Sequence, residues 1–520
     1  MTRDLSSHDL PAPEMPRSRR GLEGQRLADL GNGYYLNPIL AGDRPDPSVL
    51  KVGGDYYLVT SSFLSVPGLL IWHSKDLVNW EPVGPALGRY VGSVYAPDLV
   101  FHLGRFYIYF PAMKPAGITN MVVHADKIDG PWSDPIDLRI GRIDPGHAVS
   151  PEGKRHLFLS DGFIVPLSDD GLSVVGPEEK IYDGWKYPEH WVVESFALEG
   201  PKIMRRGDYY YMLVAEGGTA GPPTSHMVVM ARSTTLQGPW ENSPYNPIVR
   251  TCSSSEKWWS RGHGTLVEGP DQKQWYLVYH GYENGYHSLG RQTLLEPVEW
   301  TEDGWIKSAG YEVGTPIPMP AKGSAVPHDW ALSDDFRSGK IGLQWSFYQP
   351  DGPIEKRYRF EENKLVLEAF GSSPKDCSPL TLICGDQGYE AEVELEIDDR
   401  SAAGILLFYN PQLFTGLGFS EENLVECWRG DVTKFPKPDS IGRHFVIRIL
   451  NDRHIVTIWY SADREHWTKH WNQYEVSGYH HNTAGGFLSL RPALFASGSG
   501  QVRVRSFKYK VISCGMLSSS

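Results

Sequence analysis

A short turn followed by an aromatic-rich strand recurs five times in the first part of this chain. The turns lie near residues 53, 104, 153, 207 and 272, so the copies follow one another at intervals of about 50 residues. Two of the copies read Gly53-Gly54-Asp55-Tyr56-Tyr57-Leu58 and Arg206-Gly207-Asp208-Tyr209-Tyr210-Tyr211. An all-β chain must protect the edges of its sheets, and four-stranded sheets repeated around an axis do so. The repeat therefore predicts a five-bladed β-propeller.

One polar residue precedes each of the five turns by six to nine positions, where we expect the first strand of a blade. These residues are Asp46, Asp98, Asp144, Glu199 and His263. Because the first strands of a propeller line its central channel, the five side chains would meet at the axis. Clustered carboxylates raise one another's pKa, which yields a protonated acid beside an ionised base, the pair that cleaves a glycosidic bond. An Asp-Pro pair alone is also a common turn starter, but the shared register favours the channel interpretation for the set.

Several motifs, in order along the chain, resemble those of glycoside hydrolase family 43, and specifically its two-domain β-xylosidase-like members. The resemblance runs from about Asn37 to Pro320 and continues more weakly through the C-terminal part. The motifs that carry it are Asn37-Pro38-Ile39-Leu40, Pro45-Asp46-Pro47-Ser48, Ser61-Ser62-Phe63, His73-Ser74-Lys75-Asp76-Leu77-Val78-Asn79-Trp80, Tyr95-Ala96-Pro97-Asp98 and Leu289-Gly290-Arg291-Gln292-Thr293. The chain departs from the family pattern at Asp43-Arg44, before Pro-Asp-Pro, and at Lys202, after Glu-Gly-Pro.

The resemblance implies a role for each of three carboxylates. Asp46 would be the general base that activates water, and Glu199 the general acid that protonates the leaving oxygen. Asp144 would orient the acid and tune its pKa. The family inverts the anomeric configuration, so a water must fit between base and acid, with about 6.5–9.5 Å between their carboxyl groups.

Four further residues are predicted to bind the substrate. By resemblance, Arg291 would contact sugar hydroxyls and Phe63 would supply an aromatic wall for the sugar ring. Asp98 and His263, from the axial set, complete the predicted contacts. The structural alternative is that Phe63 belongs to the core and that Arg291 pairs with a nearby acid, because most aromatic residues and arginines in strands serve packing or ion pairs.

His263 has two interpretations. It is either a ligand in a structural calcium site, as in some members of the family, or a hydrogen-bonded histidine in the channel that holds a carboxylate in place. The second is favoured because calcium prefers several oxygen ligands. Since a pair of carboxylates suffices for glycosidic cleavage, we expect no required cofactor and no catalytic metal.

Composition excludes several classes of partner. The chain of 520 residues carries a formal net charge of −13, whereas nucleic-acid binding needs clustered Lys and Arg. No apolar run is long enough to span a membrane, and residues 1–24 lack the apolar core of a signal peptide, so we expect a cytoplasmic protein. The five cysteines show no metal-ligand spacing and are interpreted as reduced thiols. An oligosaccharide is the expected partner, and the oligomeric state is not indicated.

The domain boundaries follow from changes in pattern. We expect a poorly ordered leader over residues 1–30, a catalytic propeller over 31–320 and a linker over 321–330, since Pro316-Ile317-Pro318-Met319-Pro320 breaks the repeat. Short alternating strands over 331–515 predict a β-sandwich, which resembles the concanavalin-like domain of the two-domain relatives. In those relatives one loop of this domain closes the propeller's pocket. Whether it closes the pocket here or only buttresses the propeller is open.

Two functions from different classes remain. The first is an exo-acting hydrolase that releases a terminal pentose, with β-1,4-linked xylose first and α-L-arabinofuranose second. The second is a non-catalytic glycan-binding propeller. Retention of Asp46, Asp144 and Glu199 favours the hydrolase. An endo-acting hydrolase of arabinan is a third possibility, which would need an open groove.

Overall fold

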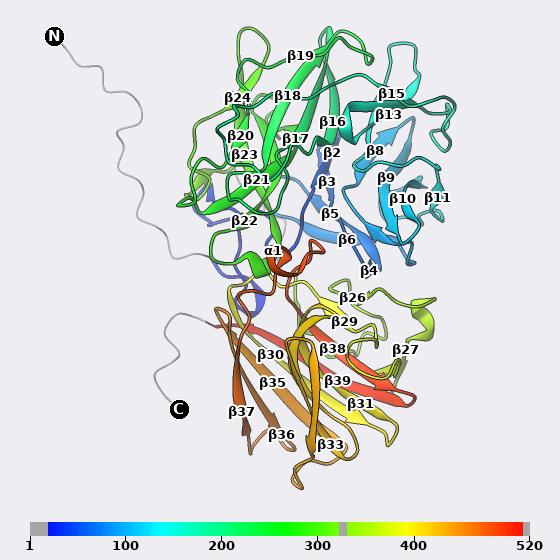
Figure 1. The fold of residues 1–520 in the computed structure, drawn as a ribbon, viewed down its shortest axis with the longest axis vertical. Helices are drawn as coiled ribbons and strands as arrows, with labels where there is room; N and C mark the ends of the chain where they lie inside the picture. Colours follow the sequence, from blue (N-terminus) through cyan, green and yellow to red (C-terminus); the bar gives the residue numbers. More distant parts are fainter. Residues whose placement is uncertain (1–18, 322–329, 513–520) are drawn as a thin grey trace, which may run out of the picture.

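The computed structural model describes residues 19–321 and 330–512. Figure 1 shows two β-rich domains stacked end to end, with the propeller above and the sandwich below. The predicted fold class, a five-bladed β-propeller followed by a concanavalin-like β-sandwich, is confirmed. No helix in the described ranges is long and apolar enough to cross a membrane.

Five antiparallel sheets form the blades, and each begins with one of the predicted hairpins. Their strands are β2 (Ser48–Val52), β3 (Asp55–Val59), β5 (Gly68–Ser74) and β6 (Glu81–Leu87); β8 (Asp98–His102), β9 (Arg105–Lys114), β10 (Gly117–Ala125) and β11 (Ile136–Asp137), with β7 (Ser93–Val94) also on β9; β12 (Gly146–Val149), β13 (Arg155–Leu159), β14 (Phe163–Pro166) and β15 (Glu179–Lys180); β16 (Glu199–Arg206), β17 (Tyr209–Glu216), β18 (Met227–Ser233) and β19 (Glu241–Asn242), with β20 (Val249–Arg250) also on β18; and β21 (Trp258–Glu268), β22 (Trp275–Glu283), β23 (Arg291–Trp300) and β24 (Ile306–Ser308). Short 3-10 turns η1 (Leu22–Gly24), η2 (Ser160–Gly162) and η3 (His287–Leu289) lie between them or before them.

The two-residue turns predicted from the sequence set the register of the first hairpins. Val52 pairs with Asp55 across Gly53-Gly54, and Gly53 has the left-handed φ of 63° that a tight hairpin turn needs. Arg206 pairs with Tyr209 in the same way, with Gly207 at φ 60°. The aromatic residues that follow these turns alternate between the two faces of a blade and fill the layers between neighbouring blades.

The ring closes between the first and the fifth blade. Leu40, just upstream of the first blade, forms a bridge with Thr293 on β23, and the Asn37 side chain hydrogen-bonds to both the carbonyl and the amide of Leu295. Outside the ring, β1 (Tyr34–Tyr35) pairs with β25 (Ile317–Pro318). Residues 19–30 of the predicted leader are described and contact both domains: Arg26 forms an ion pair with Glu283 of the propeller at 2.8 Å, and its amide donates to Asp386 of the sandwich at 3.0 Å. Residues 1–18 of the leader, and residues 322–329 of the predicted linker, lie outside the described residues.

Two sheets face each other in the sandwich. One runs in the order β34 (Asp431–Pro436), β33 (Asn423–Trp428), β32 (Leu413–Phe419), β31 (Ser401–Asn410), β38 (Arg491–Gly498), β29 (Leu380–Leu382), β26 (Trp345–Tyr348) and β4 (Ser65–Val66). The other runs β27 (Tyr358–Glu361), β28 (Lys364–Glu368), β39 (Gln501–Val511), β30 (Gly388–Ile397), β35 (His444–Asp452), β36 (Ile455–Ser461) and β37 (Thr468–Glu475), and η4 (Ile354–Lys356) precedes β27. The hairpin predicted at Asn451–His454 is present, because Asp452 pairs with Ile455 across two residues of positive φ.

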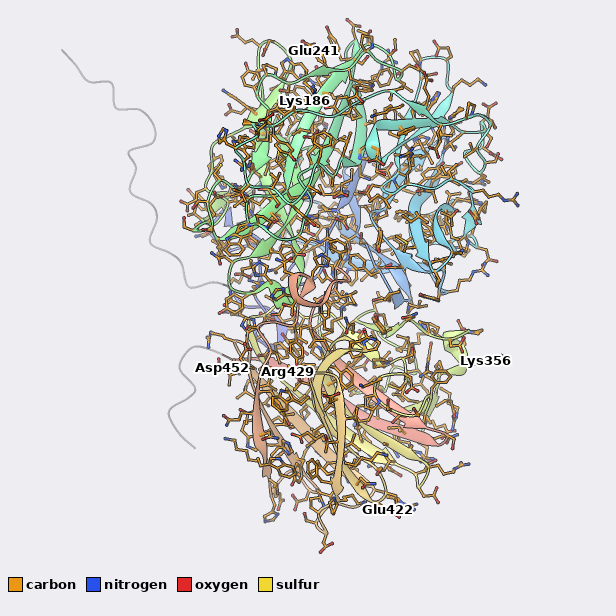
Figure 2. The ribbon with its side chains drawn as sticks, in the orientation of Figure 1. Lys186, Glu241, Lys356, Glu422, Arg429 and Asp452 are labelled. Atoms are coloured by element: carbon orange, nitrogen blue, oxygen red, sulfur yellow. The ribbon has the colours of Figure 1, made fainter. Side chains whose placement is uncertain are left out.

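The two domains share a sheet and a core. Strand β4 leaves the first blade and pairs with β26, so the propeller supplies the edge strand of the sandwich. Phe63 and Val66, each 2% exposed, belong to the sandwich core. At the end of the sandwich that faces the propeller, the turn after Asp452, labelled in Figure 2, brings His454 within 2.9 Å of the Ser288 hydroxyl.

Four of the five cysteines lie in the described residues, and all four are free thiols. Cys377, Cys384 and Cys427 are buried in the sandwich, and Cys252 is exposed. Cys514 lies outside the described residues.

A buried ion pair fixes the domains to each other. The Arg491 guanidinium on β38 donates to Asp43 Oδ2 at 2.9 Å and to Ser65 Oγ at 2.8 Å, and both charged side chains are at most 5% exposed. Asp43→Ala would leave the Arg491 charge buried without its carboxylate, and we expect the free energy of unfolding to fall by about 3–5 kcal/mol.

Denaturant unfolding monitored by tryptophan fluorescence would measure this loss. Asp126→Ala is the matched control, because it removes the carboxylate from an exposed pair with Arg105 and should leave stability nearly unchanged. An Asp43→Ala protein as stable as this control would show that the buried pair does not hold the domains together.

Candidate active site

Four of the five predicted axial residues lie at, or two residues before, the start of the first strand of their blade. Asp46 and Asp144 each precede the first strand of their blade by two residues, and Glu199 is the first residue of β16. His263 lies further along, in the middle of β21. The structure brings these together: His263 Nδ1 is 3.5 Å from Asp46 Oδ1 and 3.9 Å from Asp144 Oδ2.

The backbone at these positions takes a conformation that non-glycine residues seldom adopt. Asp46, Asp144 and His263 have φ values of 58°, 59° and 59°. Left-handed backbone at a residue with a side chain costs energy and persists where the surroundings impose it, often at functional sites. Gly200 sits between them, with its amide 3.1 Å from Asp144 Oδ2, and a Cβ there would lie 2.9 Å from the His263 ring. The close approach of His263 to the chain therefore requires a glycine after Glu199.

Asp46 is held as a carboxylate. Arg291 Nη1 donates to its Oδ1 at 2.8 Å, and the Ser61 hydroxyl donates to its Oδ2 at 2.5 Å. Burial alone would raise the pKa of Asp46, but the Arg291 charge holds it well below its usual range. A buried carboxylate that stays ionised has the properties of a general base.

Two histidines that were not predicted from the sequence, His280 and His226, lie near Asp46. His280 Nδ1 accepts a hydrogen bond from the Asp46 backbone amide at 3.0 Å, so the neutral ring carries its proton on Nε2. Burial lowers the pKa of His280 to about 4 and, together with His280, lowers that of His226 as well. The two rings stack at 5.2 Å between centroids. A polar residue inside the apolar run of β22 was the only signal in the sequence that could have revealed His280.

Glu199 has the opposite electrostatic character. Burial, and then the negative charge of Asp46, raise its pKa to about 7, although Arg291 opposes the shift. Within residues 19–321 and 330–512, the carboxyl oxygens of Glu199 make no side-chain hydrogen bond. The group is therefore a carboxylic acid near neutral pH whose proton is available to an incoming molecule.

Asp144 is fully buried beside Glu199. Burial and the charges of Glu199 and Asp46 raise the pKa of Asp144 well above its usual range, and Lys202 and the Gly200 amide only partly oppose this. Repulsion between two carboxylates is mutual, so each makes the other's proton harder to remove. Asp144 and Glu199 thus act together in keeping a proton at this position.

Asp98 is the first residue of β8, and both of its oxygens accept hydrogen bonds from the protein. Its Oδ1 accepts from Lys202 Nζ at 2.9 Å, and its Oδ2 accepts from the His147 amide at 2.7 Å. Both oxygens of Asp98 therefore bind groups of the protein, and the Asp98 carboxylate holds Lys202 in the channel. A contact between Asp98 and the substrate stays a prediction. Lys202, a departure from the family pattern, stands in turn close enough to act on Asp144.

Phe63 and Arg291 follow the structural alternative. Phe63 is 2% exposed and packs edge-on against Tyr95 at 5.8 Å, so its ring presents almost no face on which a sugar could stack. Arg291 pairs with Asp46, and its guanidinium lies 5.9 Å from the Phe63 ring. The Arg291 Nε is buried without a partner. A contact between Arg291 and substrate hydroxyls stays a prediction.

The sandwich reaches this site through one loop. Helix α1 (His481–Ala484) lies between the domains in Figure 1. Asn482 exchanges hydrogen bonds with the backbone of Gly221 in the propeller, and the Phe487 ring lies 5.2 Å from the Arg291 guanidinium. Burial and Arg291 lower the pKa of His481 to about 4, so this imidazole is neutral at physiological pH. The loop therefore contacts the residue that is paired with Asp46, and the sandwich does more than buttress the outside of the propeller.

The residues around His263 do not fit a calcium site. Within the described residues, Glu199, His226 and His263 form a cluster whose ligand atoms lie within 4.8 Å of one another, but it offers two nitrogens and one carboxylate. Calcium takes six to eight oxygen ligands. The neighbouring oxygens of Asp46 are already bound by Arg291 and Ser61. His263, whose pKa is lowered to about 3 by burial, is a neutral spacer between the two aspartates.

Family models cover most of the chain. The model for glycosyl hydrolases family 43 matches residues 35–306, and the model for the β-xylosidase C-terminal concanavalin A-like domain matches residues 333–510. The first match includes Asp46, Asp144 and Glu199, and the second covers the sandwich with its α1 loop.

Curated relatives and solved structures agree with these matches. The chain is 35% identical over 341 residues to the non-reducing end α-L-arabinofuranosidase BoGH43B of Bacteroides ovatus, covering 61% of this chain and 62% of that protein, so it spans under two thirds of that relative's length. It is 32% identical to xylosidase/arabinosidase 43B of Humicola insolens, covering 72% and 74%. Its fold matches the crystal structure of xylan β-1,4-xylosidase from Bacillus halodurans with a TM-score of 0.81 at 26% identity, over 91% and 99% of the two chains.

The mutual repulsion of Asp144 and Glu199 can be measured without any substrate. Asp144→Asn removes a carboxyl group beside Glu199, and we expect the pKa of Glu199 to fall below its value of about 7. Carbon-13 NMR of protein labelled at the glutamate carboxyls would follow the titration, with Glu199→Gln identifying the resonance. Asp137→Asn, an exposed change on β11, should leave that resonance unmoved. An unchanged Glu199 titration in Asp144→Asn would refute the coupling.

Proposed function

The chain belongs to glycosyl hydrolase family 43, and from this premise we propose that it is an inverting, exo-acting glycoside hydrolase. It releases a terminal pentose from xylan-type oligosaccharides, with β-1,4-linked xylose as the first candidate and α-L-arabinofuranose as the second. One observation carries the proposal: a single site holds a carboxylate with a strongly depressed pKa, Asp46, and a carboxylic acid with a pKa of about 7, Glu199.

The reaction uses this difference directly. Asp46 removes a proton from a water molecule as the water oxygen bonds to the anomeric carbon from one face. Glu199 gives its proton to the glycosidic oxygen, which leaves with the electron pair of the broken bond. Asp46 ends protonated and Glu199 ionised, and exchange with solvent restores both. Because the water attacks opposite the leaving group, the released sugar has the inverted anomeric configuration.

The other residues of the site orient Asp46 and Glu199 and set their protonation states. Arg291 and Ser61 bind both oxygens of Asp46, which fixes the carboxylate in one orientation and keeps it ionised. Asp144 and Glu199 disfavour a negative charge on both carboxyls at once, and Asp144 accepts from the amide that follows Glu199, which fixes the strand start. Asp144 acts through Glu199 and is a positioning residue.

The substrate class is supported by the relatives and by the sandwich loop. The relatives are named as β-xylosidases, a xylan 1,3-β-xylosidase, an α-L-arabinofuranosidase and xylosidase/arabinosidases. In this chain Asn482 and Phe487 of the sandwich contact the propeller beside Arg291. A second domain laid against the site blocks passage of a long chain on that side, which favours an enzyme that takes chain ends over an endo-acting one.

The non-catalytic alternative is disfavoured by the charges. A glycan-binding site has no need for two buried carboxyls whose pKa values are driven apart, since sugars bind through hydroxyl hydrogen bonds and apolar faces. Asp46 and Glu199 are separated in this way by burial and by Arg291.

Asp46→Asn and Glu199→Gln should each lower kcat/KM on xylobiose by about 10²–10⁴-fold, because each removes a proton-transfer group. With nitrophenyl xyloside the acid variant should retain more activity than the base variant, since the nitrophenolate leaves without a proton. Thermal unfolding of both variants checks that the fold is intact. Full activity of either variant on xylobiose would contradict its assignment.

Inversion can be observed directly by proton NMR. During early hydrolysis of a β-xyloside, the α-anomer of xylose should appear first, because water and not a protein carboxylate attacks the anomeric carbon. If the β-anomer accumulates first, the mechanism is a retaining one and Asp46 is not a general base.

Product analysis on xylooligosaccharides tests the exo mode. We expect xylose as the only early product, since one terminal residue is removed in each turnover. Arabinose from an aryl arabinofuranoside, with no xylose from the corresponding xyloside, would reverse the order of the two candidate sugars. Early disaccharides and longer fragments would instead show internal cleavage.

A further inference from the structure

A second cavity lies beside the segment that leads to Asp46, between the first blade and the sandwich. A cavity of about 200 Å³ separates the first blade from the sandwich, and two arginines, Arg44 and Arg491, are the only charged residues among those that line it in the described chain. We call it the Arg44 cavity. Arg44 is 8% exposed and Arg491 is 4% exposed, so both guanidinium groups belong to the interior.

The two arginines differ in how fully they are paired. Arg491 binds Asp43 at 2.9 Å, Ser65 at 2.8 Å and Ser489 at 3.1 Å. The Arg44 guanidinium makes one hydrogen bond within the described residues, to the Asp43 carbonyl at 3.4 Å. A guanidinium carries five donors, and a buried charge without a counter-ion is costly. One carboxylate, Asp43, thus stands against two guanidinium groups, which leaves one positive charge unbalanced.

Aromatic rings hold the Arg44 side chain in place. Its guanidinium carbon lies 5.2 Å from the Trp72 ring and 5.9 Å from the Trp330 ring. A smaller cavity of about 60 Å³ borders Arg44 as well, and its only carboxylate, Asp386, already accepts from the Arg26 amide and the Tyr509 hydroxyl. No acidic side chain of the described residues therefore reaches the free face of Arg44 with a hydrogen bond.

The rest of the wall indicates what kind of anion would fit. Ser62 lines the cavity with a buried hydroxyl that has no partner. The remaining wall is mostly apolar and includes Leu69, Ile341 and Trp345. An arginine fork matches the planar, two-oxygen geometry of a carboxylate, and an apolar wall suits a short alkyl chain. A dianion such as phosphate would reverse the imbalance by leaving a buried negative charge.

We propose that the Arg44 cavity binds a short-chain monocarboxylate, which pairs with Arg44 and Ser62 and lays its alkyl chain against Leu69, Ile341 and Trp345. The proposed site borders the catalytic one, because Ser61, which donates to Asp46, is also part of the cavity wall and Arg44 is only two residues from Asp46. Asp43 and Arg44 are the two residues at which the chain departs from the family pattern before Pro-Asp-Pro. Arg44 supplies the unbalanced charge of the cavity, and Asp43 binds Arg491. The inference does not depend on the proposed activity.

Isothermal titration of the full chain with propionate, in chloride-free buffer, tests the proposal. We expect saturable binding with one site per chain, no binding of the neutral isostere propionamide, and weaker binding of phosphate and chloride. Saturating propionate should raise the Tm by about 1 °C at ten times Kd, because a ligand that binds only the folded state stabilises it.

Arg44→Met supplies the matched variant, since methionine keeps an apolar stem of similar reach and removes the charge. Its affinity for propionate should fall by about tenfold or more, whereas Arg400→Met, which removes an exposed arginine of the sandwich, should bind as the wild type does. Unchanged affinity in Arg44→Met, or equal binding of propionamide, phosphate or chloride, would overturn the proposal. If Arg44→Met does not fold, the wild-type comparison of propionate with propionamide decides the question alone.

Discussion

The ion pair between Asp46 and Arg291 is the interaction on which the rest of the structure depends. It joins residues 245 positions apart, one from the first blade and one from the fifth, so it forms only when the propeller ring has closed. It also determines the charge of the site, because Arg291 keeps Asp46 ionised at a depth where burial alone would favour protonation. The sandwich contacts the same arginine through Phe487. The Arg291 guanidinium thus contributes to closure of the ring, to the charge of Asp46 and to the contact with the second domain.

The arrangement explains how three carboxyls of similar intrinsic acidity become different. The Arg291 guanidinium and the Ser61 hydroxyl both donate to Asp46, and both favour its charge. Glu199 and Asp144 are instead close to other carboxyls, and Lys202, a backbone amide and Arg291 oppose the rise in their pKa values only in part. The pKa of buried Asp46 is therefore lowered, whereas the pKa values of buried Glu199 and Asp144 are raised. A general base and a general acid follow from what surrounds each carboxyl and not from its residue type.

Much of this could be predicted from the sequence because the propeller is a repeat. The spacing of the turns placed Asp46, Asp144, Glu199 and His263 at equivalent positions, and the structure brings all four together. The sequence could not predict contacts that join different repeats. The partner of Asp98 is Lys202, 104 residues away, and nothing local in either sequence reveals it. Phe63 reads as a loop aromatic, but β4 carries its segment into the core of the other domain. His280 was missed for the same reason, and the sequence left open whether a loop of the sandwich reaches the site.

The central claim is that one site holds an ionised Asp46 and a protonated Glu199 near neutral pH, and the pH dependence of kcat/KM on xylobiose tests it most directly. We expect a bell whose basic limb has its midpoint near pH 7, where Glu199 loses its proton, and whose acidic limb lies below the usual carboxylate range, where Asp46 gains one. Repeating the profile with nitrophenyl xyloside should weaken the basic limb, because that leaving group needs no proton. A rate on xylobiose that stays level from about pH 5 to about pH 9 would contradict the account, because it would leave no role for a group that titrates near neutrality.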